Sequence, residues 1–176
     1  IAIITGGHGA GKTTMVKALV SAITNLKLKL KLTAPTGKAA TRISIEGLKK
    51  YNPSTIHAFL GSFESKSEES FDIMIVDECS MIDIDLMSTL LNTIPDKASI
   101  VFIGDPDQLP PVGPGQVFKD LIKSNKIKVS KLTGNYRQDS MSGIAKAARE
   151  IVKGRTPVLK NDFKNDIIFN NISRGK

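Results

Sequence analysis

Short apolar runs alternate with amphipathic stretches along the chain. The runs have the length of β-strands and lie at residues 1–5, 28–33, 71–77, 99–104 and 128–133. Helical periodicity separates them, at residues 14–26, 38–50, 86–94, 116–124 and 142–153. In the first helix, one face would carry Met15, Leu19, Ile23 and Leu26. Strands that alternate with helices pair in parallel through right-handed crossovers. The pattern therefore predicts an α/β fold, a mostly parallel sheet with helices on both faces.

Two segments qualify this pattern. Leucine and lysine alternate over residues 27–32, so that strand buries one face and is expected near an edge of the sheet or under thin cover. Residues 61–70 are polar, acidic and without periodicity, which predicts a surface loop.

Composition limits the size and setting of the protein. A chain of 176 residues can bury one full core, so we expect one domain and an appendage. The net charge of +8 suits a polyanionic partner, although a solvated basic surface would have the same charge. The single cysteine, Cys79, rules out an internal disulfide and favours a reducing, cytoplasmic setting.

The chain ends add two expectations. No apolar run approaches the roughly 18 residues of a membrane span, and no signal-peptide pattern opens the chain, so no membrane partner is expected. Because Ile1 already lies in the first predicted strand, we expect the sequence to be a piece of a longer protein.

A glycine-rich loop follows the first strand and opens the first helix, which is the context of a P-loop. Such a loop points backbone N–H groups at phosphate oxygens, and the helix adds its positive end. Lys12 would reach the β- and γ-phosphates, and the Thr13 hydroxyl would bind Mg²⁺. A flexible turn without a ligand is the alternative. The predicted nucleotide-binding residues are Gly6, Gly7, His8, Gly9, Ala10, Gly11, Lys12, Thr13 and Thr14.

Two adjacent acids, Asp77 and Glu78, end the buried strand at 71–77. The carboxyl end of a strand beside a P-loop is where α/β sheets hold ligands. Asp77 would hold Mg²⁺, and Glu78 would act as general base on the attacking water. By itself such a pair more often caps a helix, but downstream of a P-loop the catalytic interpretation is favoured. Asp83 and Asp85 are interpreted as caps of the next helix.

The strand at 99–104 ends in a proline-stiffened turn, GDPDQLPPVGPGQ. A rigid turn can hold the Gln108 amide in place, where it could accept from a water and donate to a γ-phosphate oxygen. A stiff loop without a chemical role is the alternative.

Six motifs together resemble the RecD-like branch of the superfamily-one DNA helicases, the family that contains the alpha subunit of exodeoxyribonuclease V. They occur in the order of helicase motifs I, Ia, Ib, II, III and IV: GGHGAGKTT (6–14), APTGKAA (34–40), STIHAFL (54–60), IVDECSM (75–81), GDPDQLPPVGPGQ (104–116) and LTGNYRQ (132–138). The resemblance implies a RecA-like domain and, in the longer protein, ATP hydrolysis coupled to 5'-to-3' translocation on single-stranded DNA.

Several residue roles follow from the resemblance. Gln108 would sense the γ-phosphate, Arg137 would complete the ATP site across a domain cleft, and Tyr136 would flank the adenine or simply be packed. The positions that resemble DNA contacts are Pro35, Thr36, Lys38, Thr55 and His57. Loops with hydroxyls, amides and a lysine do suit phosphate contacts. Alternatively, Thr55 caps a helix and His57 is a core histidine.

The sequence departs from the family pattern in places. His8 replaces the usual proline of the P-loop, motifs V and VI are absent, and residues 61–70 are short for a strand-separating pin. The order of the motifs predicts the domains. We predict an ATP-binding domain over residues 1–135 and the first elements of an incomplete second RecA-like domain over 136–176. The chain alone should be nearly inactive, because arginines of the facing domain must meet the charge on the γ-phosphate.

Other classes of function stay open at this stage. A P-loop kinase or small-molecule NTPase would explain the P-loop and the acidic pair but not APTGKAA or GDPDQLPPVGPG. A non-catalytic nucleic-acid-binding subunit would explain the charge but not Lys12, Asp77, Glu78 and Gln108 together. The sequence also leaves open whether the longer protein works alone or with the subunits of a nuclease complex.

Overall fold

The computed structural model describes residues 1–7, 9–64, 70–133 and 143–157. Its sheet has the strand order β3-β2-β4-β5-β1-β6, and every pairing is parallel. The strands are β1 (Ala2–Gly6), β2 (Leu30–Ala34), β3 (Ser54–Thr55), β4 (Ile73–Val76), β5 (Ser99–Gly104) and β6 (Lys128–Leu132). The predicted parallel α/β fold is confirmed.

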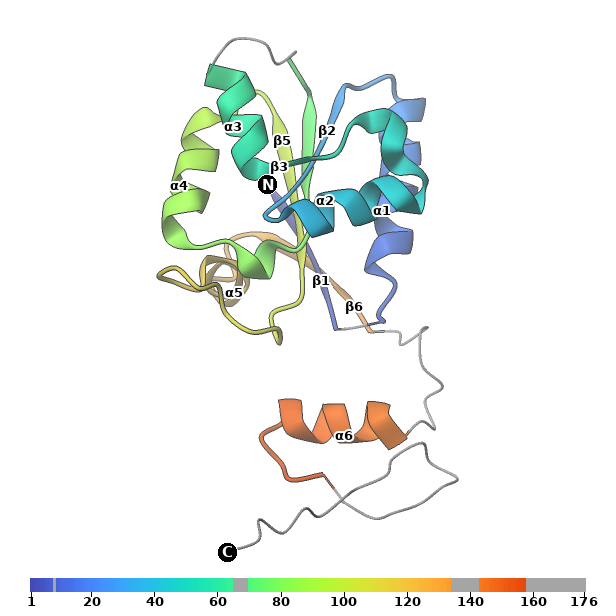
Figure 1. Cartoon of the computed structure of the whole chain (residues 1–176), viewed down its shortest axis with the longest axis vertical. Coiled ribbons are helices and arrows are strands. Elements are labelled where there is room, and N and C mark those ends of the chain that lie inside the picture. Colours follow the sequence, from blue (N-terminus) through green and yellow to red (C-terminus); the bar gives the residue numbers. More distant parts are fainter. Residues whose placement is uncertain (8, 65–69, 134–142, 158–176) are drawn as a thin grey trace, which may run out of the picture.

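Helices cover both faces of this sheet (Figure 1). They are α1 (Lys12–Asn25), α2 (Gly37–Ile43), α3 (Ile56–Glu64), α4 (Ile84–Thr93) and α5 (Val117–Lys123); α6 (Gly143–Val152) comes later in the chain. Successive strand residues face opposite sides. Ile3 packs in a core with α3, α4 and α5, whereas Ile4 packs in a second core with α1 and α2. Burial on both faces explains why the central strands are apolar throughout.

Two helix predictions need correction. The helix predicted over 38–50 ends at Ile43; a π turn (Ser44–Leu48) and a 3₁₀ turn (Lys49–Tyr51) follow, because Gly47 has φ 95° and interrupts the α-helix. In α1 the buried face holds Val16, Val20 and Ile23, but Leu26 lies beyond the end of the helix and is 69% exposed.

The prediction that the leucine and lysine strand lies near an edge of the sheet is confirmed, but the prediction that it buries only one face is wrong. β2 lies between β3 and β4, and its last three residues, Leu32, Thr33 and Ala34, are fully buried. The outer neighbour β3 pairs only with Thr33 and Ala34. β2 is therefore second from the edge, beside an outer strand of two residues that has too little pattern to predict.

The segment predicted as a surface loop is partly helical. Residues 61–64 form the end of α3, where the Phe63 ring lies 5.5 Å from the Phe59 ring, while residues 65–69 lie outside the described ranges. Apolar packing under α3 therefore outweighs the polar composition of this segment. Within the described residues, no helix combines the length and the hydropathy that crossing a bilayer requires.

Candidate functional site

Three adjacent strands bring their carboxyl ends to one edge of the sheet. β4, β5 and β1 are neighbours, and they lead into Asp77, Asp105 and the glycine-rich loop respectively. Since parallel strands all end at the same edge, segments about 30 and 100 residues apart in sequence meet there. The candidate site occupies this edge.

The glycine-rich loop curls back on itself before α1 begins. Gly9 and Gly11 have φ values of 79° and 88°, a left-handed conformation that glycine adopts without strain. Lys12 Nζ donates to the carbonyl oxygens of Gly6 and Gly7 at 2.6 and 3.0 Å and lies 4.0 Å from Asp105 Oδ2. The lysine thus bends over its own loop. His8 lies outside the described residues.

A cavity of about 320 Å³ opens in front of this loop. The N-terminus of α1 faces it, and the first turn of that helix carries no acidic side chain. Backbone N–H groups and the helix dipole make such a place suitable for an anion. The lining residues are Gly9, Ala10, Gly11, Lys12, Thr13, Thr14, Lys17, Arg42, Glu46, Glu78 and Gln108.

The acidic pair after β4 is held rigidly. Asp77 is 4% exposed, and its Oδ1 accepts a hydrogen bond from the Glu78 N–H at 2.9 Å. Burial raises the pKa of the Asp77 carboxyl, an effect that the Glu78 N–H and the Arg42 cation only partly offset. Glu78 has φ 55°. That left-handed conformation is uncommon for a residue with a side chain, and such residues cluster at functional sites.

The oxygens at this edge fit a small divalent cation. Thr13 and Asp77 line one narrow space, and hydroxyl and carboxylate oxygens are the ligands that Mg²⁺ uses in nucleotide sites. A cationic group, the Arg42 guanidinium, already lies 3.0 Å from Asp77 Oδ2.

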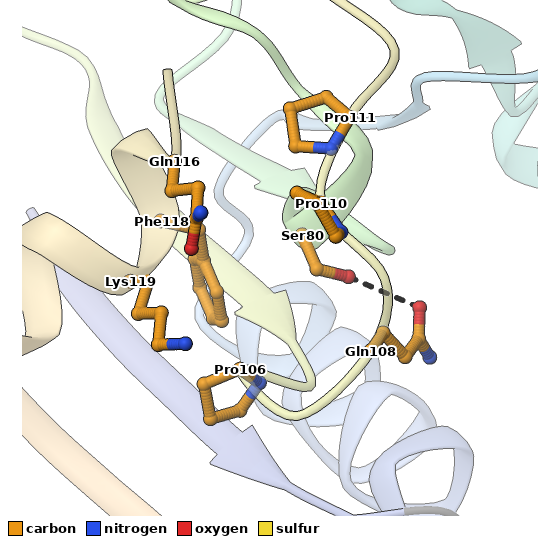
Figure 2. A pocket seen from close by; sticks show the side chains of 8 residues that line it. All are labelled: Ser80, Pro106, Gln108, Pro110, Pro111, Gln116, Phe118 and Lys119. Atoms are coloured by element: carbon orange, nitrogen blue, oxygen red, sulfur yellow. Dashed lines mark hydrogen bonds between the residues drawn. The ribbon is translucent and has the colours of Figure 1, made fainter.

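Gln108 contacts Glu78 of the acidic pair and, after it, Ser80. Its Nε2 donates to Glu78 Oε2 at 3.3 Å, and its Oε1 accepts from the Ser80 hydroxyl at 3.1 Å. Figure 2 shows Pro106, Pro110 and Pro111 along the same loop. The hollow between them and α5 measures about 20 Å³, room for about one water molecule. The loop therefore positions an amide and does not form a ligand pocket of its own.

Sequence reasoning missed two charged residues of the site. Arg42 of α2 pairs with Asp77 at 3.0 Å and with Glu78 at 2.8 Å. Burial would lower the pKa of Arg42, but the charges of Glu78 and Asp77 together raise it. Asp105, 4% exposed, pairs with Lys12. Its signal was present in the sequence, because Asp105, like Asp77, directly follows a buried apolar strand. Nothing in the sequence around Arg42 indicated that this residue belongs to the site.

The residues that resemble DNA contacts lie at the ends of two neighbouring strands, β2 and β3. Thr36 and Thr55 accept hydrogen bonds from the N–H groups of Ala39 and Ala58, at 3.3 and 3.0 Å. The alternative that Thr55 caps a helix is thus confirmed. The alternative of a core histidine is wrong, because His57 is exposed. Lys38 is exposed and Pro35 half-buried.

The remaining predicted residues divide into two groups. Asp83 caps α4 as predicted, accepting from the Leu86 N–H at 2.9 Å, whereas Asp85 lies in the first turn of the helix and is not its cap. Tyr136 and Arg137, together with the predicted domain boundary between residues 135 and 136, lie outside the described residues.

Comparison with known proteins gives consistent results. A family described as AAA domain matches residues 1–168. The chain is 38% identical to the ATP-dependent RecD2 DNA helicase of Deinococcus radiodurans over 89% of its own length, and 33% identical to the RecBCD enzyme subunit RecD of Buchnera aphidicola over 95%. It spans 22% and 38% of those relatives. The RecD-like resemblance of the motifs is confirmed.

Solved structures share the fold. The Pif1 helicase from Candida albicans superposes with a TM-score of 0.64 at 22% identity, over 89% of this chain and 41% of that one. A Bacteroides Pif1 in complex with ADP-AlF4 gives 0.59 at 22% identity, over 84% of this chain and 41% of that one.

Close packing around Gly6 gives a test of the loop geometry. A Cβ added at Gly6 would lie 2.9 Å from the Ala10 Cβ and 3.0 Å from the Leu132 Cβ, whereas one added at Gly7 would meet nothing within 4 Å. We expect Gly6→Ala to lower the free energy of unfolding by about 1–3 kcal/mol, the cost of overpacking. Gly7→Ala should stay within about 0.5 kcal/mol of the parent protein. Urea denaturation of both variants measures this, and equal midpoints would contradict the loop packing.

Proposed function

The chain belongs to the AAA domain family, and on that premise we propose that it is the ATP-binding motor domain of a RecD-like DNA helicase. The observation that carries the proposal is the convergence of the glycine-rich loop, Glu78 and Gln108 on one cavity of about 320 Å³. For the longer protein we propose ATP hydrolysis coupled to 5'-to-3' movement along single-stranded DNA. The names of the RecD2 and RecD relatives support this interpretation.

Each residue of the site has a proposed role in phosphoryl transfer. Residues 6–14 bind the phosphates through backbone N–H groups, and Lys12 exchanges the carbonyls of Gly6 and Gly7 for the β- and γ-phosphates. Thr13 and Asp77 hold Mg²⁺, which neutralises phosphate charge when bound. Glu78 accepts a proton from the attacking water. Gln108, which contacts Glu78 in the described structure, orients that water beside the γ-phosphate.

The proposal includes a second domain. Residues 1–135 would form the ATP-binding domain, and residues 136–176 would begin its partner, with Arg137 stabilising charge on the γ-phosphate and Tyr136 flanking the adenine. The cleft between two such domains would open and close with the nucleotide state. A kinase or a small-molecule NTPase would require neither a partner domain of this kind nor DNA.

The proposed DNA path follows the segments after β2 and β3, where α2 and α3 begin. Lys38 and His57 are exposed there, and Thr36 and Thr55 keep their hydroxyl hydrogens available for phosphate oxygens while they cap helices. Pro35 begins the first of these segments. Because α2 starts in this path and reaches Glu78 through Arg42, the path and the nucleotide cavity share one helix.

Loss of the lysine side chain tests nucleotide binding. We expect Lys12→Ala to weaken Mg–ADP binding by about 2–3 kcal/mol, because charged hydrogen bonds to phosphate disappear. The control is Lys97→Ala, an exposed lysine just before β5 at the opposite edge of the sheet. Calorimetry should show unchanged affinity for this control. Equal Mg–ADP affinity of Lys12→Ala and the parent protein would refute the P-loop assignment.

Salt dependence tests the DNA path. Binding of single-stranded oligothymidine should weaken as salt rises, because phosphate contacts release counterions. Lys38→Ala should lower affinity and reduce the magnitude of the log–log salt slope by about 1, the effect of one phosphate contact. Lys97→Ala should change neither quantity. Fluorescence anisotropy over a salt series measures both, and a slope that Lys38→Ala leaves unaltered would place the DNA elsewhere.

A further inference from the structure

One cation holds both carboxylates of the acidic pair. The Arg42 guanidinium lies 3.0 Å from Asp77 Oδ2 and 2.8 Å from Glu78 Oε1. The side chain of Asp77 is 6% exposed and that of Glu78 12%. Lys12, another cation beside this edge, pairs with Asp105 and with carbonyls of its own loop. The ion pair of Arg42 therefore occupies an oxygen of Asp77, the carboxylate that is proposed to hold the metal.

We propose that Arg42 is a positioning residue. In the nucleotide-free protein its guanidinium binds the carboxylates of Asp77 and Glu78, and the Mg–nucleotide replaces it there. The inference rests on the proposed function and adds a competing occupant of the same site. It requires that the two cations exclude each other, that the released side chain has space, and that Glu78 is restrained until the exchange.

The two cations exclude each other on electrostatic grounds. A guanidinium at hydrogen-bonding distance from Asp77 and a divalent cation on the same carboxylate would repel each other strongly at this partly buried edge. The carboxylates cannot be left without a cation either, because a buried and unpaired charge is costly. Arrival of one cation and departure of the other are therefore coupled.

The released side chain has somewhere to go. Arg42 lies between the nucleotide cavity and a second hollow of about 670 Å³, and it lines both. Its side chain is 40% exposed, so leaving the carboxylates breaks little packing. Glu46 also lines both hollows and pairs with Lys17 at 3.7 Å, which gives the guanidinium another carboxylate to contact.

The same contact restrains Glu78. One carboxylate oxygen of Glu78 bonds to Arg42 and the other accepts from Gln108 Nε2 at 3.3 Å. With both oxygens engaged, the proposed general base has less capacity to take a proton from water. Departure of Arg42 frees Oε1 at the moment the nucleotide arrives.

Magnesium dependence of nucleotide binding tests the exchange. The measured quantity is the free Mg²⁺ concentration at which a fluorescent ADP is half-maximally bound. Arg42→Gln removes the competing cation and should lower this concentration by about two- to fivefold, the range of one partly exposed ion pair. Lys97→Gln is the charge-matched control, because Lys97 is exposed just before β5, at the end of the sheet opposite the cavity. It should produce no comparable decrease.

Each outcome decides the matter. A half-saturating Mg²⁺ concentration that is unchanged or raised in Arg42→Gln would overturn the exchange. Weaker ADP binding by Arg42→Gln would show instead that Arg42 is a phosphate ligand. An equal decrease in Lys97→Gln would show that the loss of any positive charge has this effect, which would overturn the exchange. If Arg42→Gln does not fold, Arg42→Lys, which keeps a charge but loses the two-pronged geometry, should give a smaller decrease, and no decrease would overturn the exchange. Absence of Mg–ADP binding in the parent protein would instead refute the proposed function itself.

Discussion

The parallel pairing of β4, β5 and β1 is the constraint on which the site depends. Parallel strands deliver their carboxyl ends to one edge, and here those ends lead into the acidic pair, the Gln108 loop and the glycine-rich loop. The positions are fixed by two cores, one on each face of the sheet, which make slippage of any of these strands costly. Residues far apart in sequence can therefore be held to contact distances, as the 3.3 Å between Gln108 and Glu78 illustrates.

Charge compensation is the second constraint on this edge. Asp77 and Asp105 are both buried, and each has a basic partner, Arg42 and Lys12 respectively. Without these partners the carboxylates would oppose folding. The two cations are therefore part of the folded structure before any nucleotide is present. Under the proposed function and the proposed exchange, both cations change partners when phosphates arrive, so nucleotide binding rearranges contacts that already exist.

The sequence allowed much of this arrangement to be predicted, because its strongest signals are local. Buried strands, the glycine-rich loop and strand-end acids each occupy a short stretch with a distinctive composition. Arg42 could not be predicted, because it meets Asp77 across 35 residues of chain and the two are brought together only by the packing of α2. The end of α2 was misplaced because a single residue, Gly47 at φ 95°, interrupts an otherwise amphipathic run. The burial of both faces at the end of β2 could not be predicted, because Thr33 and Ala34 pair there with β3, a two-residue strand without a pattern.

ATP turnover tests the proposed motor function most directly, since it requires the whole proposed site. Steady-state hydrolysis would be measured with and without single-stranded DNA, in this chain and in a chain extended to the length of its relatives. We expect DNA-stimulated turnover in the longer protein, abolished by Glu78→Gln. In the 176-residue chain we expect a rate about 10³- to 10⁵-fold lower, the factor that arginines of the proposed partner domain would contribute. Robust ATP turnover by the shorter chain, or turnover by the longer chain that does not change when DNA is added, would contradict the proposed function.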